Sequence, residues 1–361
     1  MHIERVELTD FRSYESLLFN PVPKLNILTG PNAQGKTNLL EGLALLAVGR
    51  SFRGAKPLEM TRWGAKSAAV SGEIRRSDSA RRLRRVLAPR EDGVWSLMGE
   101  GCAWARVIPF GWADLAIVNG PPQARRNFLD GFVAKIYPSY ASTHRRYRQV
   151  LARRNHLLQV GGGGSQGRLE PWNEQIVDLG MEIVSRRRQG VVALSTEAER
   201  LYPALGGSGS IAIEYRSALG DVPTAASFHE RLRARFPEEI RRGQTLVGPH
   251  RDDLLVALQG RDLRTFGSRG QQRLMALTLR LAEAAPVEEA VGSAPVILLD
   301  DALSELDPGI QERVLVHVSG VGQVFLTTAD APLSDAAEAH WWEVRNGEVR
   351  DASYAALRGA A

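Results

Sequence analysis

The sequence LNILTGPNAQGKTNLLEGLALL, residues 25–46, decides the fold of this chain. A short apolar run at residues 25–28 leads into a glycine-containing loop, and apolar residues at helical spacing follow the loop. The loop has the spacing G-x-x-x-x-G-K-S/T between a predicted strand and a predicted helix, which is typical of a phosphate-binding loop. The alternative is a chance glycine turn before a helix, and the patterns on either side argue against it.

The chemistry of such a loop suits a nucleotide. Its backbone N–H groups surround phosphate oxygens, and the start of the helix adds positive potential. Lys36 is placed to reach the β- and γ-phosphates, and Thr37 is placed to hold Mg²⁺. The candidate binding residues of this segment are Gly30, Pro31, Asn32, Ala33, Gln34, Gly35, Lys36, Thr37 and Asn38.

Length and composition narrow the class of protein. A chain of 361 residues suggests two or more domains, or one domain with a large insertion. No apolar run approaches the roughly 20 residues of a membrane helix, and the N-terminal sequence MHIERVELTDFRSYE is charged where a signal peptide would be apolar. Cys102 is the single cysteine, which excludes an intramolecular disulfide and a cysteine-based zinc site. We therefore expect a cytoplasmic protein.

The positive charge is concentrated in the middle of the sequence. Residues 121–243 hold 19 Arg and Lys against 12 Asp and Glu, a net charge of +7, whereas the whole chain has +5. The remaining residues therefore carry −2. This distribution fits a nucleic-acid surface in the middle segment, and on charge alone a solvated face explains it equally well.

Hydrophobic periodicity predicts how the chain is divided. Strands are expected within residues 1–20 and at 68–74, 83–87, 95–98 and 105–110. Helical patterns at 123–160, broken near Pro138, and at 172–201 are joined by a glycine-rich loop at 161–167, so we expect two antiparallel helices. A strand at 211–215 and a basic helix at 225–236 follow. We predict a nucleotide-binding domain of residues 1–120 and 244–361 with a mainly helical insertion, 121–243.

The segment VILLDD, residues 296–301, supplies the acids that a phosphate-binding loop needs nearby. Four apolar residues suit a buried parallel strand, and Asp300 and Asp301 end it. We expect Asp300 to ligate Mg²⁺ or its water, and Asp301 to orient and deprotonate the attacking water. The alternative for a single buried acid is a structural salt bridge.

Two further motifs flank this strand in the sequence. The segment SRGQQ, residues 268–272, precedes a strongly apolar helical pattern, and such a turn at a helix start is a candidate anion site. The alternative is an ordinary helix cap by Ser268. The segment SELD, residues 304–307, follows the two acids.

The order and spacing of these motifs resemble the ABC-type ATPase heads of the SMC superfamily and, within it, the RecF family of bacterial recombination mediators. Residues 30–37 match Walker A, Asp300 and Asp301 match Walker B and its catalytic acid, 268–272 match the signature motif, and 304–307 match the D-loop. The hallmarks that carry the resemblance are DFRSYESL, LTGPNAQGKTNLLE, GRSFR, RRNFLD, LVGPHRDDL, SRGQQRL and LLDDALSELD.

The resemblance implies an α/β fold, an ABC-type ATPase head with an antiparallel β layer and a second, mainly helical domain inserted in it. It implies ATP and Mg²⁺ as cofactors and an ATP-dependent homodimer in which the signature motif acts on the partner's nucleotide. The further nucleotide-binding residues that it implies are Arg12, Ser13, Ser268, Arg269, Gly270, Gln271 and Asp307.

The resemblance also implies partners. It predicts binding to double-stranded DNA near single-strand junctions, cooperation with RecR and RecO, and RecA loading at single-stranded gaps in repair and replication restart. The alternatives are the ATPase subunit of a membrane transporter and a non-hydrolysing DNA-binding scaffold. The transporter would usually carry a conventional signature and a switch histidine, and the scaffold would not need intact loop and Walker B residues.

Several residues depart from the ABC pattern. The signature is SRGQQ, and Asp301 stands where glutamate is usual. The shorter acid at 301 leads us to expect weak ATP hydrolysis, and the resemblance implies that DNA stimulates it. Thr328 takes the usual position of the γ-phosphate switch histidine, and residues 110–114 depart from the family's pattern there. No Q-loop glutamine can be assigned.

Overall fold

The structure is a computed structural model that describes residues 1–160, 166–329 and 339–352. Most of the predicted glycine-rich loop at 161–167 lies outside the described residues. By its internal contacts the chain divides into two units. Unit 1 comprises Met1–Leu115, Leu201–Ser208 and Arg269–Ala361, and unit 2 comprises Ala116–Arg200 and Gly209–Ser268.

Five antiparallel strands form the first sheet of unit 1, in the order β2-β1-β4-β5-β6. Alternating side chains of β1, including Val6 and Leu8, are buried, as the period of two in the sequence predicts. The strands predicted in residues 1–98 are confirmed. Their bounds are β1 (His2–Phe11), β2 (Tyr14–Phe19), β4 (Ala68–Arg76), β5 (Ser79–Pro89) and β6 (Trp95–Met98).

The second sheet of unit 1 has six strands in the order β14-β13-β3-β12-β11-β7. The five strands from β13 to β7 are parallel, and β14 pairs antiparallel to β13 at the edge. Every residue of β3, β11 and β12 is buried, which explains their continuous apolar runs. The bounds are β3 (Leu25–Thr29), β7 (Val107–Phe110), β11 (Val296–Leu299), β12 (Val324–Thr327), β13 (His340–Arg345) and β14 (Glu348–Ala352).

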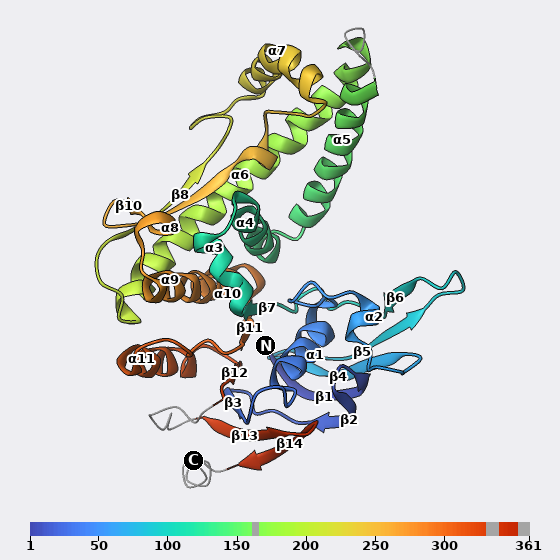
Figure 1. The fold of residues 1–361 in the computed structure, drawn as a ribbon, viewed down its shortest axis with the longest axis vertical. Coiled ribbons are helices and arrows are strands. Elements are labelled where there is room, and N and C mark those ends of the chain that lie inside the picture. Colours follow the sequence, from blue (N-terminus) through green and yellow to red (C-terminus); the bar gives the residue numbers. More distant parts are fainter. Residues whose placement is uncertain (161–165, 330–338, 353–361) are drawn as a thin grey trace. The chain divides into compact units, whose positions relative to one another are not determined.

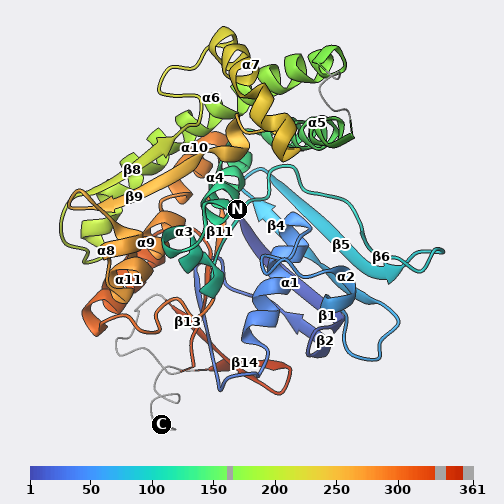
Figure 2. The same cartoon turned by 45° about the horizontal axis from the view of Figure 1, so that its top comes forward.

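Helix α1 (Lys36–Val48) lies between these two sheets and contacts strands of both. Ten of its 13 residues are buried, so it is apolar around most of its circumference and not only on one face. Figure 2 shows α1 against β1, β4 and β5. The remaining helices of unit 1 are α2 (Pro57–Met60), the 3₁₀ helix η1 (Trp112–Leu115), α9 (Arg269–Leu281), α10 (Ala284–Val291) and α11 (Pro308–Ser319).

Unit 2 is mainly helical, and α5 and α6 run side by side in it (Figure 1). Thr143 Oγ1 donates to Glu182 Oε1 at 3.2 Å, and Arg154 Nε donates to Asn173 Oδ1 at 2.9 Å, so the two helices are antiparallel as predicted. The break near Pro138 is also confirmed, because α4 ends before it and α5 begins after it. The helices are α3 (Ala116–Asn119), α4 (Pro122–Ile136), α5 (Tyr140–Val160), α6 (Gln166–Ala204), α7 (Ala225–Arg242) and α8 (Leu263–Phe266).

Two helices of unit 2 are longer than the sequence predicts. Helix α6 begins at Gln166 and includes Pro171, whereas the predicted helix began at 172. Helix α7 continues through Pro237 to Arg242, whereas the prediction ended at 236. Proline removes one backbone hydrogen bond from a helix. The helix nevertheless continues through Pro237, and its residues Phe228, Leu232 and Glu239 are buried.

A three-stranded antiparallel sheet, β10-β9-β8, completes unit 2. The strands are β8 (Ile211–Arg216), β9 (Asp253–Leu258) and β10 (Arg261–Asp262), with the 3₁₀ helix η3 (Pro249–Arg251) before β9. Ile213 pairs with Val256, so residues 244–268 belong by their contacts to unit 2 and not to the nucleotide-binding unit. The predicted domain bounds of 1–120, 121–243 and 244–361 stay a prediction about folding domains.

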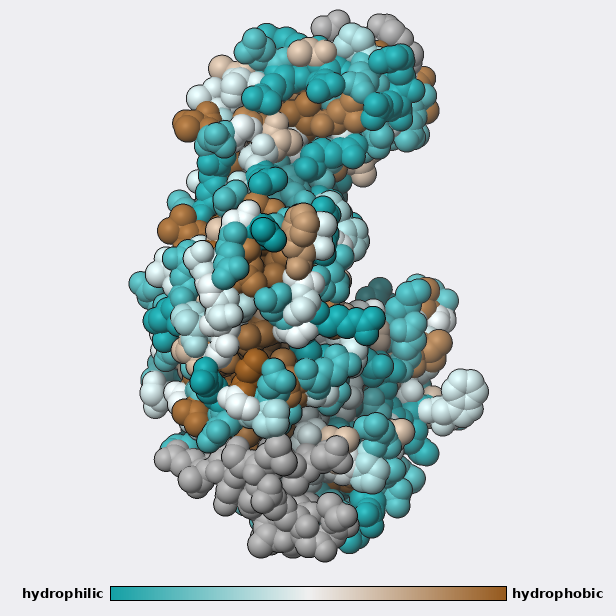
Figure 3. Space-filling model, turned by 60° about the vertical axis from the view of Figure 1, so that its left-hand side comes forward, coloured by the Kyte–Doolittle hydropathy of each residue, from teal (hydrophilic) through white to brown (hydrophobic). Residues whose placement is uncertain are grey.

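Hydrophilic residues dominate the surface drawn in Figure 3, where hydrophobic residues form separate patches. Helix α6 has 39 residues but carries three consecutive arginines, Arg186, Arg187 and Arg188. Within residues 1–160, 166–329 and 339–352, no helix is both long and apolar enough to cross a membrane.

Candidate nucleotide-binding site

The loop between β3 and α1 has the backbone of a phosphate-binding loop. Gly30 and Gly35 have φ values of 136° and 115°, which favour glycine. A Cβ on Gly30 would lie 2.3 Å from the backbone oxygen of Val344, and one on Gly35 would lie 2.9 Å from the Tyr14 hydroxyl. Larger residues at either position would therefore force the loop away from β13 or from Tyr14.

Lys36 and Thr37 begin α1 and face the loop and β11. Lys36 Nζ donates to the carbonyl oxygens of Gly30 and of Pro31, the latter at 2.9 Å. Thr37 Oγ1 donates to Asp300 Oδ1 at 2.8 Å, across 263 residues of sequence. The carboxyl ends of parallel strands meet at one edge of a sheet, which is why the loop after β3 and the acids after β11 come together.

A pocket of about 270 Å³ lies at this edge, within unit 1. The loop and the two acids line it together, as the sequence predicts. Its lining residues are Asn32, Ala33, Gly35, Lys36, Thr37, Asn38, Trp112, Asp300, Asp301, Thr327 and Ala329. Gln34 is tied to the neighbouring strands, since its Oε1 accepts from the Asn346 backbone N–H at 2.8 Å.

Asp300 is held by two hydroxyl groups. In addition to Thr37, Thr327 Oγ1 donates to Asp300 Oδ1 at 2.9 Å. Burial raises the pKa of Asp300, and these two hydroxyls and the Arg53 charge oppose the rise, while the Asp301 charge adds to it. The sequence places Thr327 among the polar residues that end this strand but assigns the switch position to its neighbour Thr328, which is half-buried and is not among the residues that line the pocket.

Asp301 has a left-handed backbone with φ of 51°, a conformation that costs a non-glycine residue energy. Hydrogen bonds fix it on both sides. Its N–H donates to Thr327 Oγ1 at 2.9 Å, and its carbonyl accepts from an Arg273 guanidinium N–H at 2.6 Å. The structure therefore holds the main chain of this acid firmly while its side chain faces the pocket.

Arg273 links the acid to two other elements of the site. This buried residue of α9 also donates to Ser304 Oγ at 2.6 Å, in the predicted D-loop. Its guanidinium lies 5.2 Å from the ring centroid of Trp112, which follows β7 and lines the pocket. Sequence reasoning missed both residues. The departure of residues 110–114 from the family's pattern was the signal that could have indicated Trp112.

Arg12 lies in a different environment from the one expected. Its guanidinium donates to both carboxylate oxygens of Glu41, at 2.7 and 3.0 Å, and to the Glu59 carbonyl at 2.5 Å. Glu41 is fully buried on α1. Ser13 lies closer to the loop, since its Oγ accepts from Asn38 Nδ2 at 3.0 Å. Neither Arg12 nor Ser13 lines the pocket in the described chain.

The signature and D-loop residues are also absent from this lining in the described chain. Ser268, Arg269 and Gly270 are exposed at the start of α9, and Gln271 is half-buried. Asp307 is exposed just before α11. The structure therefore brings the Walker A and Walker B residues together, and leaves the signature residues on the surface.

The residues present fit a magnesium ion. Mg²⁺ prefers hard oxygen ligands and is usually bound through one or two protein groups together with substrate phosphates. Thr37 Oγ1 and Asp300 Oδ1 are such oxygens, and they lie within hydrogen-bond distance of each other at the pocket. When bound, the ion would neutralise phosphate charge.

The fold and the site together define an ABC-type ATPase head with an antiparallel β layer, as predicted. A family model described as an AAA domain matches residues 5–92. The chain belongs to the RecF family. The DNA replication and repair protein RecF of Desulforudis audaxviator (strain MP104C) is 37% identical over 345 residues, which covers 92% of this chain and 96% of that relative.

Solved structures agree with this membership. A structure of the recombination mediator protein RecF with ATP in the RecFOR pathway has a TM-score of 0.85 at 27% identity and covers 98% of both chains. An Smc head bound to the C-terminal winged-helix domain of ScpA has a TM-score of 0.56 at 16% identity, again over 98% of both chains. The latter likeness concerns the fold alone.

Proposed function

We propose that this chain is an ATP-dependent recombination mediator. In this proposal ATP drives a head-to-head homodimer that binds double-stranded DNA near single-strand junctions. With RecR and RecO, the dimer promotes RecA loading at single-stranded gaps in the cytoplasm, and slow hydrolysis releases it. Membership of the RecF family supports the repair role. The DNA, RecR, RecO and RecA contacts come from the family resemblance.

The exposed signature motif is the observation that carries the dimer. A Cβ on Gly270 would meet no atom within 4 Å among the described residues, so packing inside the chain does not require glycine there. The lack of a side chain at this exposed position leaves room for a ligand to approach the backbone from outside. The N-terminus of α9 adds backbone donors that suit a phosphate. We infer that Ser268, Arg269, Gly270 and Gln271 close on the nucleotide of a second copy, with Asp307 beside them.

The residues of the pocket have separate roles in this proposal. Lys36 neutralises the β- and γ-phosphates, and Thr37 and Asp300 hold Mg²⁺. Asp301 orients the attacking water and takes its proton. Aspartate is one methylene shorter than the usual glutamate, so its carboxylate reaches less far and we expect weak turnover. Stimulation of this turnover by DNA comes from the family resemblance.

ATP-dependent dimerisation tests the assignment of the two half-sites. We would measure molar mass by light scattering, with and without ATP, for the parent chain and for Lys36→Met and Ser268→Arg. Lys36→Met should lose ATP binding and remain monomeric. Ser268→Arg should bind ATP as the parent does and still fail to dimerise, because the added side chain fills the space of the partner's nucleotide.

The outcomes separate the proposal from its rivals. A dimeric Ser268→Arg variant would contradict the role of the signature in the partner's site, and a dimeric Lys36→Met variant would contradict the P-loop assignment. Turnover measured with and without duplex DNA completes the test. A non-hydrolysing scaffold gives no turnover, and a transporter subunit gives turnover that duplex DNA does not change.

A further inference from the structure

Unit 2 contains a polar cavity of about 410 Å³ between α4, α5, α6 and η3. Two hallmark segments of the sequence, RRNFLD and LVGPHRDDL, contribute to it, and neither takes part in the nucleotide-binding pocket. The charged and imidazole groups that line it are Arg126, Asp130, His144, Arg148, Arg187 and His250. We call this cavity the arginine pocket. Its volume lies in the range of small-molecule sites.

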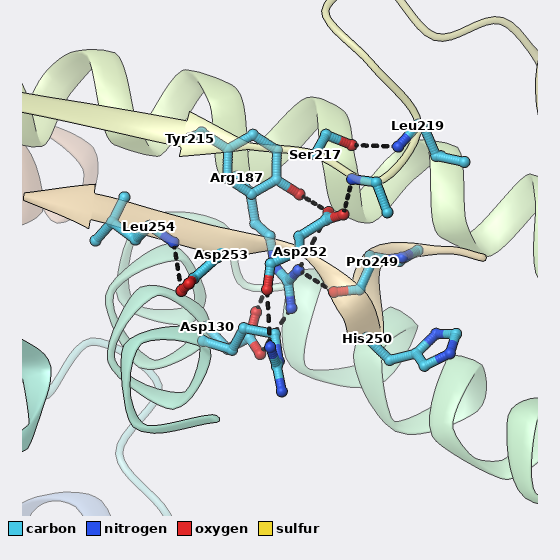
Figure 4. A network of polar contacts seen from close by, with 12 residues as sticks. Asp130, Arg187, Tyr215, Ser217, Leu219, Pro249, His250, Asp252, Asp253 and Leu254 are labelled. Atoms are coloured by element: carbon cyan, nitrogen blue, oxygen red, sulfur yellow. Dashed lines mark hydrogen bonds and ion pairs between the residues drawn. The ribbon is translucent and has the colours of Figure 1, made fainter. Parts of the chain in front are cut away.

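The floor of the arginine pocket is an ion pair of Arg187 and Asp130, whose polar atoms are already hydrogen-bonded within the chain. Arg187 is buried and donates to both carboxylate oxygens of Asp130, at 2.8 and 3.0 Å, and to the Pro249 carbonyl at 2.6 Å. Tyr140 also donates to Asp130, at 2.5 Å. Figure 4 shows Arg187 between Asp130 on one side and Asp252 and Pro249 on the other. The carboxylate of the pocket is thus already neutralised by its partners.

The two histidines of the pocket add no charge near neutral pH. Tyr147 Oη donates to His250 Nδ1 at 2.7 Å and His250 Nε2 donates to the Thr245 carbonyl at 3.0 Å, the tautomer that satisfies both atoms. Burial lowers the pKa of His250 to about 4. Burial also lowers the pKa of His144, against the attraction of Asp130. Three guanidinium groups against one carboxylate leave the lining with two excess positive charges.

Two of these guanidinium groups belong to different walls. Arg126 of α4 is fixed by donating to the Asp252 carbonyl at 2.8 Å and to Gln123 Oε1 at 3.0 Å. Arg148 of α5 is exposed and makes no hydrogen bond or ion pair within the part of the chain that the structure describes. A planar fork suits phosphate oxygens. Two forks on separate helices suit an anion with several oxygens better than a carboxylate, which has two.

We propose that the arginine pocket binds a phosphate ester, as a site separate from the P-loop, with Arg148 and Arg126 as its ligands. The ester comes either from a free nucleotide or from the backbone of a nucleic acid. The second source rests on the proposed DNA-binding function, whereas the first does not.

Pyrophosphate binding to the Lys36→Met chain tests the site, because this background disables the P-loop. Calorimetric titration should detect binding. Arg148→Ala should weaken it about tenfold, since a hydrogen bond to a charged group contributes that much. Arg145→Ala is the matched control: Arg145 is an exposed arginine of the same helix and does not line the pocket. It should stay within about twofold of its parent. Equal loss in both variants, or no loss in Arg148→Ala, would overturn the proposal.

Duplex DNA binding, measured by anisotropy over a range of salt concentrations, then identifies the source. If the ligand is a nucleic-acid phosphate, Arg148→Ala should make the slope of log affinity against log salt less steep by about 0.9, the value of one phosphate contact. Pyrophosphate should then also compete with DNA. If the ligand is a free nucleotide, Arg148→Ala should leave DNA binding unchanged and lose pyrophosphate binding. Pyrophosphate binding that depends on Arg148 would survive a failure of the dimer proposal, because the two tests use different sites.

Discussion

Thr327 holds both acids of the site through one hydroxyl group. It donates to Asp300 and accepts from the N–H of Asp301. Thr327→Val keeps the shape of this buried residue, but leaves the Asp301 N–H unsatisfied and frees Asp300 on one side. We expect ATP turnover to fall about tenfold or more, as for other groups that orient metal ligands, with ATP affinity largely kept.

Thr328→Val is the matched control for this prediction, because the same substitution falls one residue later. The measurement is steady-state phosphate release, together with nucleotide affinity. A larger loss at Thr328 than at Thr327 would contradict the positioning role of Thr327. It would instead support the switch role that the sequence suggests for Thr328.

Glu41 joins three sequence motifs that look independent along the chain. It lies on α1, accepts two hydrogen bonds from Arg12 of DFRS, and accepts one from Ser51 of GRSFR. Removing one partner of a buried ion pair leaves the other charge without compensation. Glu41→Gln should therefore lower the free energy of unfolding by about 3 kcal/mol, measured by urea denaturation.

Glu15→Gln is a suitable control for Glu41→Gln, because Glu15 is exposed and its ion-pair distance to Arg62 is 3.9 Å. Surface pairs of this kind contribute about 0–1 kcal/mol. If both variants lose the same small amount, Glu41 does not anchor Arg12. In that case Arg12 would be available for the nucleotide contact that the resemblance implies.

At the scale of elements, local patterns predicted most of the secondary structure. The strands, the P-loop and the break at Pro138 follow from residues within a few positions of each other. Helix α7 did not follow, because Pro237 signals a helix end, whereas the helix that the structure describes continues to Arg242. Local patterns also do not indicate that residues 244–268 contact unit 2, because the pairing of β8 with β9 joins residues some 40 positions apart.

The site shows the same division between local and distant information. Lys36, Thr37, Asp300 and Asp301 could be predicted, since their motifs specify their chemistry. The bonds of Thr327 to Asp300 and of Arg273 to Asp301 could not, because they depend on which strands and helices become neighbours. RRNFLD and LVGPHRDDL gave family membership but no role. In the structure Arg125 pairs with Asp253 at 2.6 and 2.9 Å, which ties α4 to β9.

The buried network around η3 makes the stability of unit 2 depend on pH. The pKa of His250 is about 4 in the folded chain, below its ordinary 6.5, because burial disfavours the charged form. Between these values the unfolded chain binds a proton that the folded chain does not. Stability from this group is therefore complete above pH 6.5 and is lost as pH falls toward 4, by about 3 kcal/mol.

Urea denaturation between pH 4 and pH 7 checks this, with His250→Gln as the comparison. The variant should lose the share of the pH dependence that His250 contributes, so the difference in unfolding free energy between the two chains should shrink as the pH falls. His144 and Asp252 also titrate with shifted pKa values, but both remain in the variant and cancel. A difference that stays constant over this range would show that His250 is not held neutral.

At the scale of the whole molecule, the proposed dimer contains two composite sites, each built from one chain's P-loop and the other chain's signature. Lys36→Met damages the first half and Ser268→Arg damages the second. In a mixed dimer, the two damaged halves fall in the same site. The other site then combines an intact P-loop with an intact signature, so two chains that are inactive alone should complement each other.

Steady-state ATP turnover of an equimolar mixture measures this complementation. Because neither variant is expected to dimerise with itself, every dimer that forms is mixed and has one working site of two, so turnover should reach at most about half of the parent's. Each variant measured alone, at the same total chain concentration, should stay inactive. If the signature served the nucleotide of its own chain, both variants would be defective whatever their partner, and mixing would restore nothing.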